Sequence, residues 1–499
     1  MVGEGLLILL GALLIWPVAW SLGRILLPSR SVLPRSLWEE TCASSLLGAA
    51  LISVVGTAAV AARIPFLVAY VLTMAGGIAA CAWLFWRRKR KPDLEWQSLE
   101  WSWPFVLLLG ALAVGAAAMT LAMPLNELDP LLHFGYRGKI LHFHGTVLND
   151  ALLGMDGPQE YGRIATHPNY PLGVPVLEAW AAQLGGWSDR WVQAPFAWLA
   201  ACLPGAVALG LRGISLSAAR RGALLAACTP MIYVSNLFAH PAEDLASAGL
   251  GGPLTLGGGG DLPLAALFAL GCALLLRAQR ANCIRTALAA GLAFAGGAMM
   301  KNEGLALAGV AFLATVLTAI FPSRPRGRIS AACWAAAALC IGPWLVVRAQ
   351  LPVIDEDYGT QFTPARIMEV IGGMQEPPHL PGDAGGATEG DASTEVLLRR
   401  DLVARAFVEE IFDLRTWGLL WLAAVTGIFV AFRRWRDPES RWLALVVGGG
   451  LLLYVLILLV TPWHFPSLRE KGIPERLMVH LLGPCALLAG AVYSARPRS

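Results

Sequence analysis

Charged side chains are scarce in this sequence. Only 14% of its 499 residues are Asp, Glu, Lys or Arg, whereas an average soluble domain carries about 25%. Hydrophobic residues make up 56% of the chain and the mean hydropathy is +0.59. This composition excludes an ordinary soluble protein and indicates a polytopic membrane protein. The net charge of +4 is mild, so we expect membrane lipids and no nucleic acid as partners.

Three further patterns are missing. The nine cysteines have spacings that fit neither a zinc site nor a disulfide framework, so we interpret them as small structural residues. No basic stretch precedes the first apolar run, which is therefore expected to be a membrane helix and not a cleavable signal. A repeat of fixed period is not visible either.

Thirteen apolar runs approach the roughly 20 residues that a membrane-spanning helix needs. Backbone groups in lipid must satisfy their own hydrogen bonds, so the predicted fold class is an all-α membrane helical bundle, a single domain over 1–499. The predicted spans are 5–27, 41–63, 64–86, 104–124, 189–212, 219–238, 262–280, 286–300, 303–321, 330–349, 414–432, 440–461 and 475–494.

Basic residues predict the orientation of these spans. The strongest cluster, the run RRKRK at 87–91, should be cytoplasmic. With thirteen crossings, all the other Arg-rich connections fall on the same side, and the long hydrophilic segments 125–188 and 350–413 fall outside. We therefore expect a multi-pass protein of the inner (plasma) membrane with two large extracytoplasmic loops.

Two stretches of these loops carry structural predictions of their own. Residues 171–186 are apolar, but a crossing there would invert every later basic cluster, so we expect a helix that lies along the outer surface or dips into it. Residues 372–393 are rich in Gly, Pro and Asp, which predicts a flexible excursion or lid.

A polar island, Asn126-Glu127-Leu128-Asp129-Pro130, directly follows the apolar run 104–124. Carboxylates at this spacing can hold a divalent cation such as Mg²⁺ or Mn²⁺. One of them could instead act as a general base for an acceptor hydroxyl. The alternative is that Glu127 and Asp129 simply solvate the loop.

Other candidate residues lie at predicted helix ends on the outer side. His167 and Tyr170 belong to the motif HPNYP, and their alternative role is that of interfacial anchors. Asp261 opens a predicted span, where it could either face a cavity or cap the helix.

The motif Lys301-Asn302-Glu303-Gly304 joins two apolar runs, so its charges lie close to membrane depth. Such charges are costly unless they pair with each other or bind a charged ligand. Arg476 adds positive charge to the outer side, where an anionic ligand or a lipid head group would explain it.

Together these motifs resemble the GT-C superfamily of integral-membrane glycosyltransferases, in particular the bacterial relatives of protein mannosyltransferases and aminoarabinose transferases. The resemblance rests on five stretches in this order: Asp129–Lys139, His167–Pro171, Asp261–Leu264, Lys301–Gly304 and Glu475–Leu477. It implies a sugar donor linked to polyprenyl phosphate and transfer on the extracytoplasmic side. It also implies an essential acid at Asp129, with Glu127 as its partner.

The predicted function is therefore an inverting transfer of a sugar to a glycan, lipid or protein acceptor. Positive charge near the leaving lipid phosphate would supply most of the catalysis, and the candidates are Arg137, Lys139, Lys301 and Arg476. The alternatives are a transporter or lipid flippase, and a polymer-assembly scaffold without catalysis. The missing repeat and the one-sided polar motifs favour the enzyme.

Overall fold

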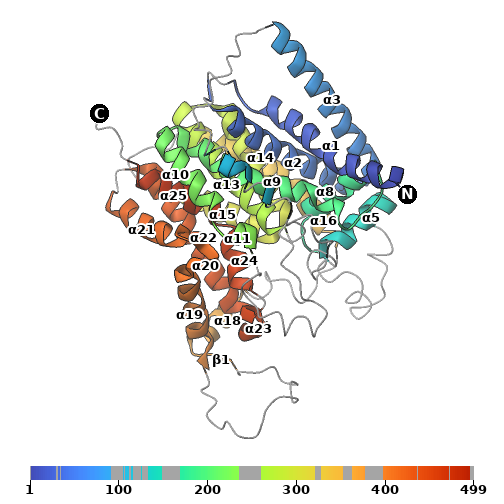
Figure 1. Ribbon diagram of the computed structural model, residues 1–499. Coiled ribbons are helices and arrows are strands. Elements are labelled where there is room, and N and C mark those ends of the chain that lie inside the picture. Colours follow the sequence, from blue (N-terminus) through green and yellow to red (C-terminus); the bar gives the residue numbers. More distant parts are fainter. Residues whose placement is uncertain are drawn as a thin grey trace, which may run out of the picture.

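The computed structural model is almost entirely helical over the residues that it describes (Figure 1). Within them, the only β structure is an antiparallel pairing of β1 (Gln375–Glu376) with β2 (Leu397–Leu398). The described residues are 2–29, 32–33, 35–90, 105, 107–111, 114–115, 118, 125, 133–148, 169–234, 260–320, 327–351, 362–376, 397–434, 437–470 and 472–494.

Eight described helices are long and apolar enough to cross a membrane, which confirms the all-α class and a multi-pass membrane protein. They are α1 (Val2–Leu26), α2 (Leu37–Ala61), α3 (Phe66–Arg90), α9 (Ala194–Arg212) with the preceding turn η2 (Trp191–Gln193), α13 (Asp261–Ala281), α15 (Asn302–Ile320), α16 (Gly327–Arg348) and α22 (Pro438–Val460).

The other predicted spans are shorter or broken. Two apolar helices, α14 (Ile284–Met300) and α21 (Leu420–Arg433), are shorter than the eight. A ninth span is formed if α24 (Ile473–Val479) and α25 (Leu482–Val492), which meet at a bend of 54°, count as one. The predicted span 104–124 lies mostly outside the described residues.

Proline and glycine explain where the predicted helices break. The predicted helix 219–238 is divided into α10 (Leu216–Ala227) and α11 (Met231–Val234), because Pro230 disfavours helical backbone at the residue before it. Between α24 and α25, Pro484 has no N–H to donate to the carbonyl of His480. The predicted helix 414–432 starts as α20 (Leu414–Trp417) and is interrupted at Gly418, whose φ is 56°.

Small residues let the helices pack closely. A Cβ at Gly23 of α1 would lie 1.8 Å from the carbonyl oxygen of Ser44, and a Cβ at Gly48 of α2 would lie 1.8 Å from that of Ala19. Backbones of membrane helices approach in this way at small residues. Helices α9 and α13 occupy the centre, whereas α3 exposes most of its apolar side chains, as expected of a helix that faces lipid (Figure 1).

The apolar segment predicted at 171–186 forms α8 (Gly173–Ala182), and every residue of α8 is buried. It packs against α1, α2 and α5 (Tyr136–His144). Its first residue, Gly173, lies against the backbone of Met299 at the end of α14. The segment therefore dips into the bundle and does not lie along its surface.

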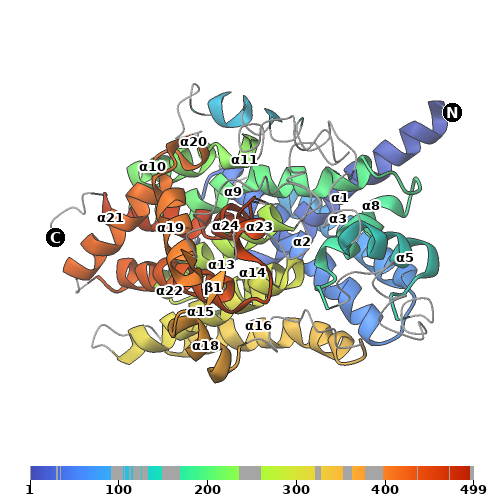
Figure 2. The ribbon, with the colours of Figure 1, turned by 90° about the horizontal axis from the view of Figure 1, so that it is seen from below.

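The remaining described parts of the second hydrophilic segment gather at one end of the bundle. There α18 (Pro364–Ile371), α19 (Arg399–Phe412) and α23 (Phe465–Glu470) lie together with the β pairing (Figures 1 and 2). Residues 377–396, which include most of the predicted lid at 372–393, lie outside the described residues.

Candidate functional site

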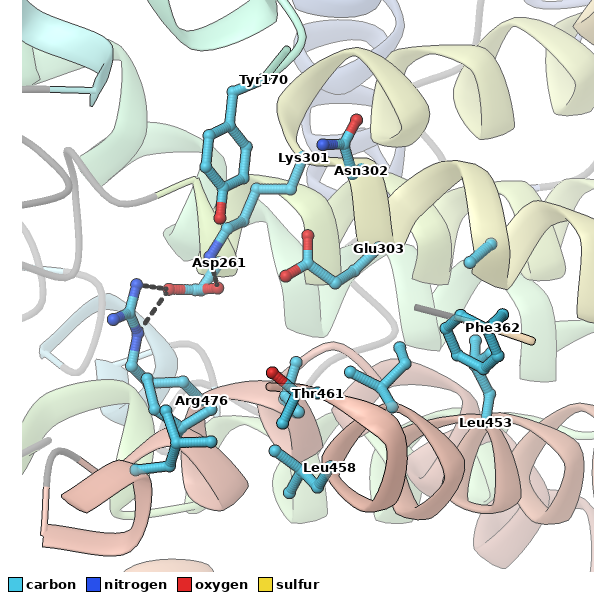
Figure 3. A pocket seen from close by; sticks show the side chains of 15 residues that line it. Tyr170, Asp261, Lys301, Asn302, Glu303, Phe362, Leu453, Leu458, Thr461 and Arg476 are labelled. Atoms are coloured by element: carbon cyan, nitrogen blue, oxygen red, sulfur yellow. Dashed lines mark hydrogen bonds and ion pairs between the residues drawn. The ribbon is translucent and has the colours of Figure 1, made fainter. Parts of the chain in front are cut away.

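A cavity of about 210 Å³ opens where α13, α15, α22 and α24 approach one another (Figure 3). Five of the candidate residues line it, namely Tyr170, Asp261, Lys301, Glu303 and Arg476. The other lining residues are Asn302, Ala306, Phe362, Leu453, Ile457, Leu458, Thr461, Leu468, Ile473 and Leu477.

Asp261 is placed in this cavity by the start of α13. The preceding Gly260 has a φ of 77°, a left-handed conformation that glycine adopts most readily, and it acts as the N-cap. Asp261 is then the first residue of the helix, where an acid also interacts favourably with the helix dipole. The N-cap position, which was the alternative role of Asp261, is occupied by Gly260.

The Asp261 carboxylate instead joins three side chains from distant parts of the chain (Figure 3). Lys301 Nζ donates to Oδ1 at 2.8 Å, and Arg476 donates to Oδ2 through Nε and Nη2, both at 3.2 Å. His480 Nε2 lies 2.8 Å from Oδ1. Both carboxylate oxygens are thus fully engaged, and Asp261 orients the two cations.

Lys301 occupies the junction between α14 and α15. Its backbone is extended, with φ −150° and ψ 158°, and the residue is only 4% exposed. A buried lysine at membrane depth needs a partner, and Lys301 pairs with Asp261. Lys301 and Arg476 thus meet at one carboxylate, and two cations gathered at one place can bind an anion, although Glu303 also lines the cavity and balances their charge.

His480 and Tyr454 extend this network behind the cavity. Both side chains are fully buried, and the Tyr454 hydroxyl lies 2.8 Å from His480 Nδ1. The Asp261 carboxylate can only accept, so His480 Nε2 carries the proton and donates to it. Sequence reasoning did not name these two residues, although His480 was the one histidine inside a predicted span, which is itself a sign of function.

Tyr170 connects the cavity to the segment that follows the polar island. Its ring stacks on that of His133, with 5.8 Å between the centroids, and lies 5.4 Å from that of Phe134. His133 is four residues after Asp129 in the sequence. Glu127, Asp129 and His167 themselves lie outside the described residues.

The opposite side of the cavity is apolar. It is formed by α22 and by residues that precede α18 or belong to α23 and α24, namely Leu453, Ile457, Leu458, Phe362, Leu468 and Leu477. Two cations beside an apolar wall suit an amphipathic ligand, whose anion would bind at Lys301 and Arg476 while its hydrocarbon part lies on the wall.

Two predicted phosphate ligands do not line this cavity. Arg137 is buried on α5. Lys139, also on α5, pairs with Asp189 at 3.0 Å and lies over the ring of Trp187. These residues are close to Asp129 in the sequence, but in the structure α5 packs against α8.

Metal binding remains a prediction for this protein. Among the described residues, no three His, Cys, Asp or Glu side chains gather where they could share a metal ion. The proposed ligands of Mg²⁺ or Mn²⁺, Glu127 and Asp129, are not among those residues.

Comparison with known proteins gives little. No protein-family model matches the sequence, and no curated protein matches it. One solved structure is similar, the Archaeoglobus fulgidus oligosaccharyltransferase tethered to an acceptor peptide that contains the NVT sequon, with a TM-score of 0.40 and 13% identity. The match covers 79% of this chain and 50% of that one, so the chain spans about half the length of that protein.

Proposed function

We propose that this protein is a GT-C type membrane glycosyltransferase that transfers a sugar from a polyprenyl-phosphate-linked donor to a glycan, lipid or protein acceptor. The observation that supports the proposal most is the cavity in which Lys301 and Arg476 converge on Asp261 beside an apolar wall. A lipid phosphate has the matching chemistry, because its anion needs buried cations and its chain needs an apolar surface.

In the proposed reaction, the oxygen of an acceptor hydroxyl attacks the anomeric carbon of the donor sugar from the face opposite the phosphate. The bond between that carbon and the phosphate oxygen breaks, and its electron pair leaves with the lipid phosphate. The acceptor proton passes to the Asp129 carboxylate. Lys301 and Arg476 stabilise the negative charge that develops on the leaving phosphate, which is where preorganised charge accelerates a reaction most.

The sidedness of the reaction is part of the proposal. The cavity lies at the N-terminal end of α13, the junction of α14 and α15, and the C-terminal end of α22. The count from the basic cluster at 87–91 places these helix ends on the extracytoplasmic side of the inner membrane. Donor, acceptor and catalytic groups would meet there.

Donor binding and sugar transfer, measured separately in the purified protein, test this proposal. Lys301→Met and Arg476→Gln should weaken binding of a polyprenyl-phosphate-linked sugar at least about tenfold, since each removes a charge-assisted contact. Asp129→Asn should bind the donor normally but lower the transfer rate roughly 10²–10⁴-fold, as expected for a general base.

Two results would contradict the proposal. Unchanged donor affinity in both cation variants would reject the phosphate site. A wild-type protein that binds the lipid-linked sugar and moves it across vesicle bilayers without transferring it would favour the lipid flippase instead.

A further inference from the structure

Two hydrogen-bond acceptors in the cavity are left without donors. Oε2 of Glu303 and Oδ1 of Asn302 are buried, and no donor within the described part of the chain reaches either of them. Both residues line the cavity, and Glu303 extends into it toward Lys301 and Asp261 (Figure 3). A buried acceptor without a partner is unfavourable, so such a pair indicates that the cavity can bind a hydrogen-bond donor.

The contrast with Asp261 shows what kind of ligand the cavity suits. Asp261 already receives hydrogen bonds from Lys301, Arg476 and His480, and it has no free oxygen to offer. Glu303 and Asn302 lie next to Lys301 in sequence and open the same helix, α15. The cavity thus presents cations and open acceptors side by side. Its ligand must carry an anion together with hydrogen-bond donors a few ångströms away.

We infer that Glu303 and Asn302 bind hydroxyl groups of the donor sugar, and that they set the preference of this cavity for a glycosylated lipid phosphate over a bare one. The inference rests on the proposed function, because it assumes that Lys301 and Arg476 hold the phosphate. Hydroxyl hydrogen bonds to a carboxylate are short and strong, and the desolvated cavity strengthens them further.

A simpler role for Glu303 must be separated from this one. An acidic residue in the first turn of a helix interacts favourably with the helix dipole. That role would affect the stability of the protein, but it would not distinguish between two ligands with the same phosphate and the same lipid chain.

Binding of two probe types to the detergent-solubilised full-length protein tests the inference. One probe is farnesyl phosphate, and the others are farnesyl phosphate esters of a hexose and of a pentose. Glu303→Gln should weaken binding of the preferred sugar ester roughly tenfold or more. It should leave the affinity for bare farnesyl phosphate unchanged or raise it, because it removes a negative charge close to the phosphate. Asn302→Ala should act in the same direction.

Matched variants make each failure recognisable. Arg476→Gln should weaken binding of both probe types. Glu439→Gln, which alters a first-turn glutamate of α22 paired with Arg280, should change neither affinity. The inference is overturned if Glu303→Gln weakens both probe types equally, or if wild-type protein binds no sugar ester more tightly than farnesyl phosphate. If wild-type protein does not bind farnesyl phosphate at all, the proposed function itself fails.

Discussion

At the scale of single residues, the hydrogen-bonded chain from Tyr454 through His480 to Asp261 determines how firmly the two cations are held. The Tyr454 hydroxyl forms a hydrogen bond with His480 Nδ1, and His480 Nε2 donates to Asp261. Neither Tyr454 nor His480 is among the residues that line the cavity, so we regard both as positioning residues.

Removal of the Tyr454 hydroxyl should therefore weaken donor binding, although this hydroxyl does not contact the donor. In Tyr454→Phe, His480 Nδ1 loses its partner, and we expect the donor Kd to rise about fivefold, which corresponds to a hydrogen bond worth about 1 kcal/mol. His480→Leu should have the larger effect, because Asp261 itself loses a donor. Titration of the purified variants with donor measures both effects.

Tyr493→Phe is the matched control, because Tyr493 bonds to Thr426 on α21, away from the cavity. A fall in melting temperature for Tyr454→Phe without any change in donor Kd would show that the hydrogen bonds from Tyr454 through His480 to Asp261 only stabilise the fold.

The sequence predicted the charged members of this site but not their pairing. Asp261, Lys301 and Arg476 were recognised because each puts a charge at the end of an apolar run. Their contact joins residues 40 and 215 positions apart, which no local pattern reveals. Tyr454 gave no signal, since a tyrosine in an apolar run is also a common interfacial residue.

At the scale of elements, the sequence predicted the helices better than their interruptions. Long uniform runs such as α2 and α22 were confirmed, because apolar length is a strong signal. The bend at His480 depends on a proline placed four residues later. For α8, the sequence left open whether the segment lies along the surface or dips into the bundle, because burial among neighbouring helices depends on tertiary contacts.

The contact between α19 and α24 predicts a pH-dependent stability. Burial and the neighbouring Glu475 carboxyl raise the pKa of Glu410 to about 8. The other groups that face it are Asp413, which acts in the same direction, and the Trp417 indole, which donates to it and opposes the shift. On its own helix, Glu409 pairs with Arg469 and Arg405.

The sign of this dependence follows from the raised pKa. The folded protein binds the Glu410 proton more tightly than the unfolded chain, so this contribution is present below about pH 4.5 and is lost as pH rises toward 8. We expect the melting temperature in detergent to fall between pH 6 and pH 8.5, and Glu410→Gln should flatten that fall. Differential scanning fluorimetry across this range measures the effect.

The control for this experiment is Asp401→Asn, an exposed carboxylate on the same helix. If Glu410→Gln keeps the full pH dependence of wild type, the contact between Glu410 and Glu475 is not its source.

At the scale of the whole molecule, the cavity and the arginine–glutamate pairs lie at opposite ends of the helices. The cavity lies at the Asp261 end of α13, while Arg280 near its other end pairs with Glu439 at the start of α22. α13 has 21 residues and is therefore about 30 Å long. Arg212, at the end of α9, pairs with Glu39 at the start of α2 on this same far side. The Arg212 and Arg280 ends of these helices and the cavity thus lie on opposite sides of the bundle.

The direction of this axis across the membrane is the last prediction, and single cysteines can test it. In a background without the nine native cysteines, Asp150→Cys and Gly385→Cys should react with an impermeant thiol reagent added to intact cells. Ser323→Cys, in a connection predicted to be cytoplasmic, should react only after lysis.

Five native cysteines are buried, so the background needs conservative alanine or serine replacements and a check that donor binding persists. If position 150 or 385 is labelled only after lysis and position 323 is accessible in intact cells, the orientation of the protein in the membrane is the reverse of the predicted one. The cavity would then open to the cytoplasm, and the proposed transfer on the extracytoplasmic side would be impossible.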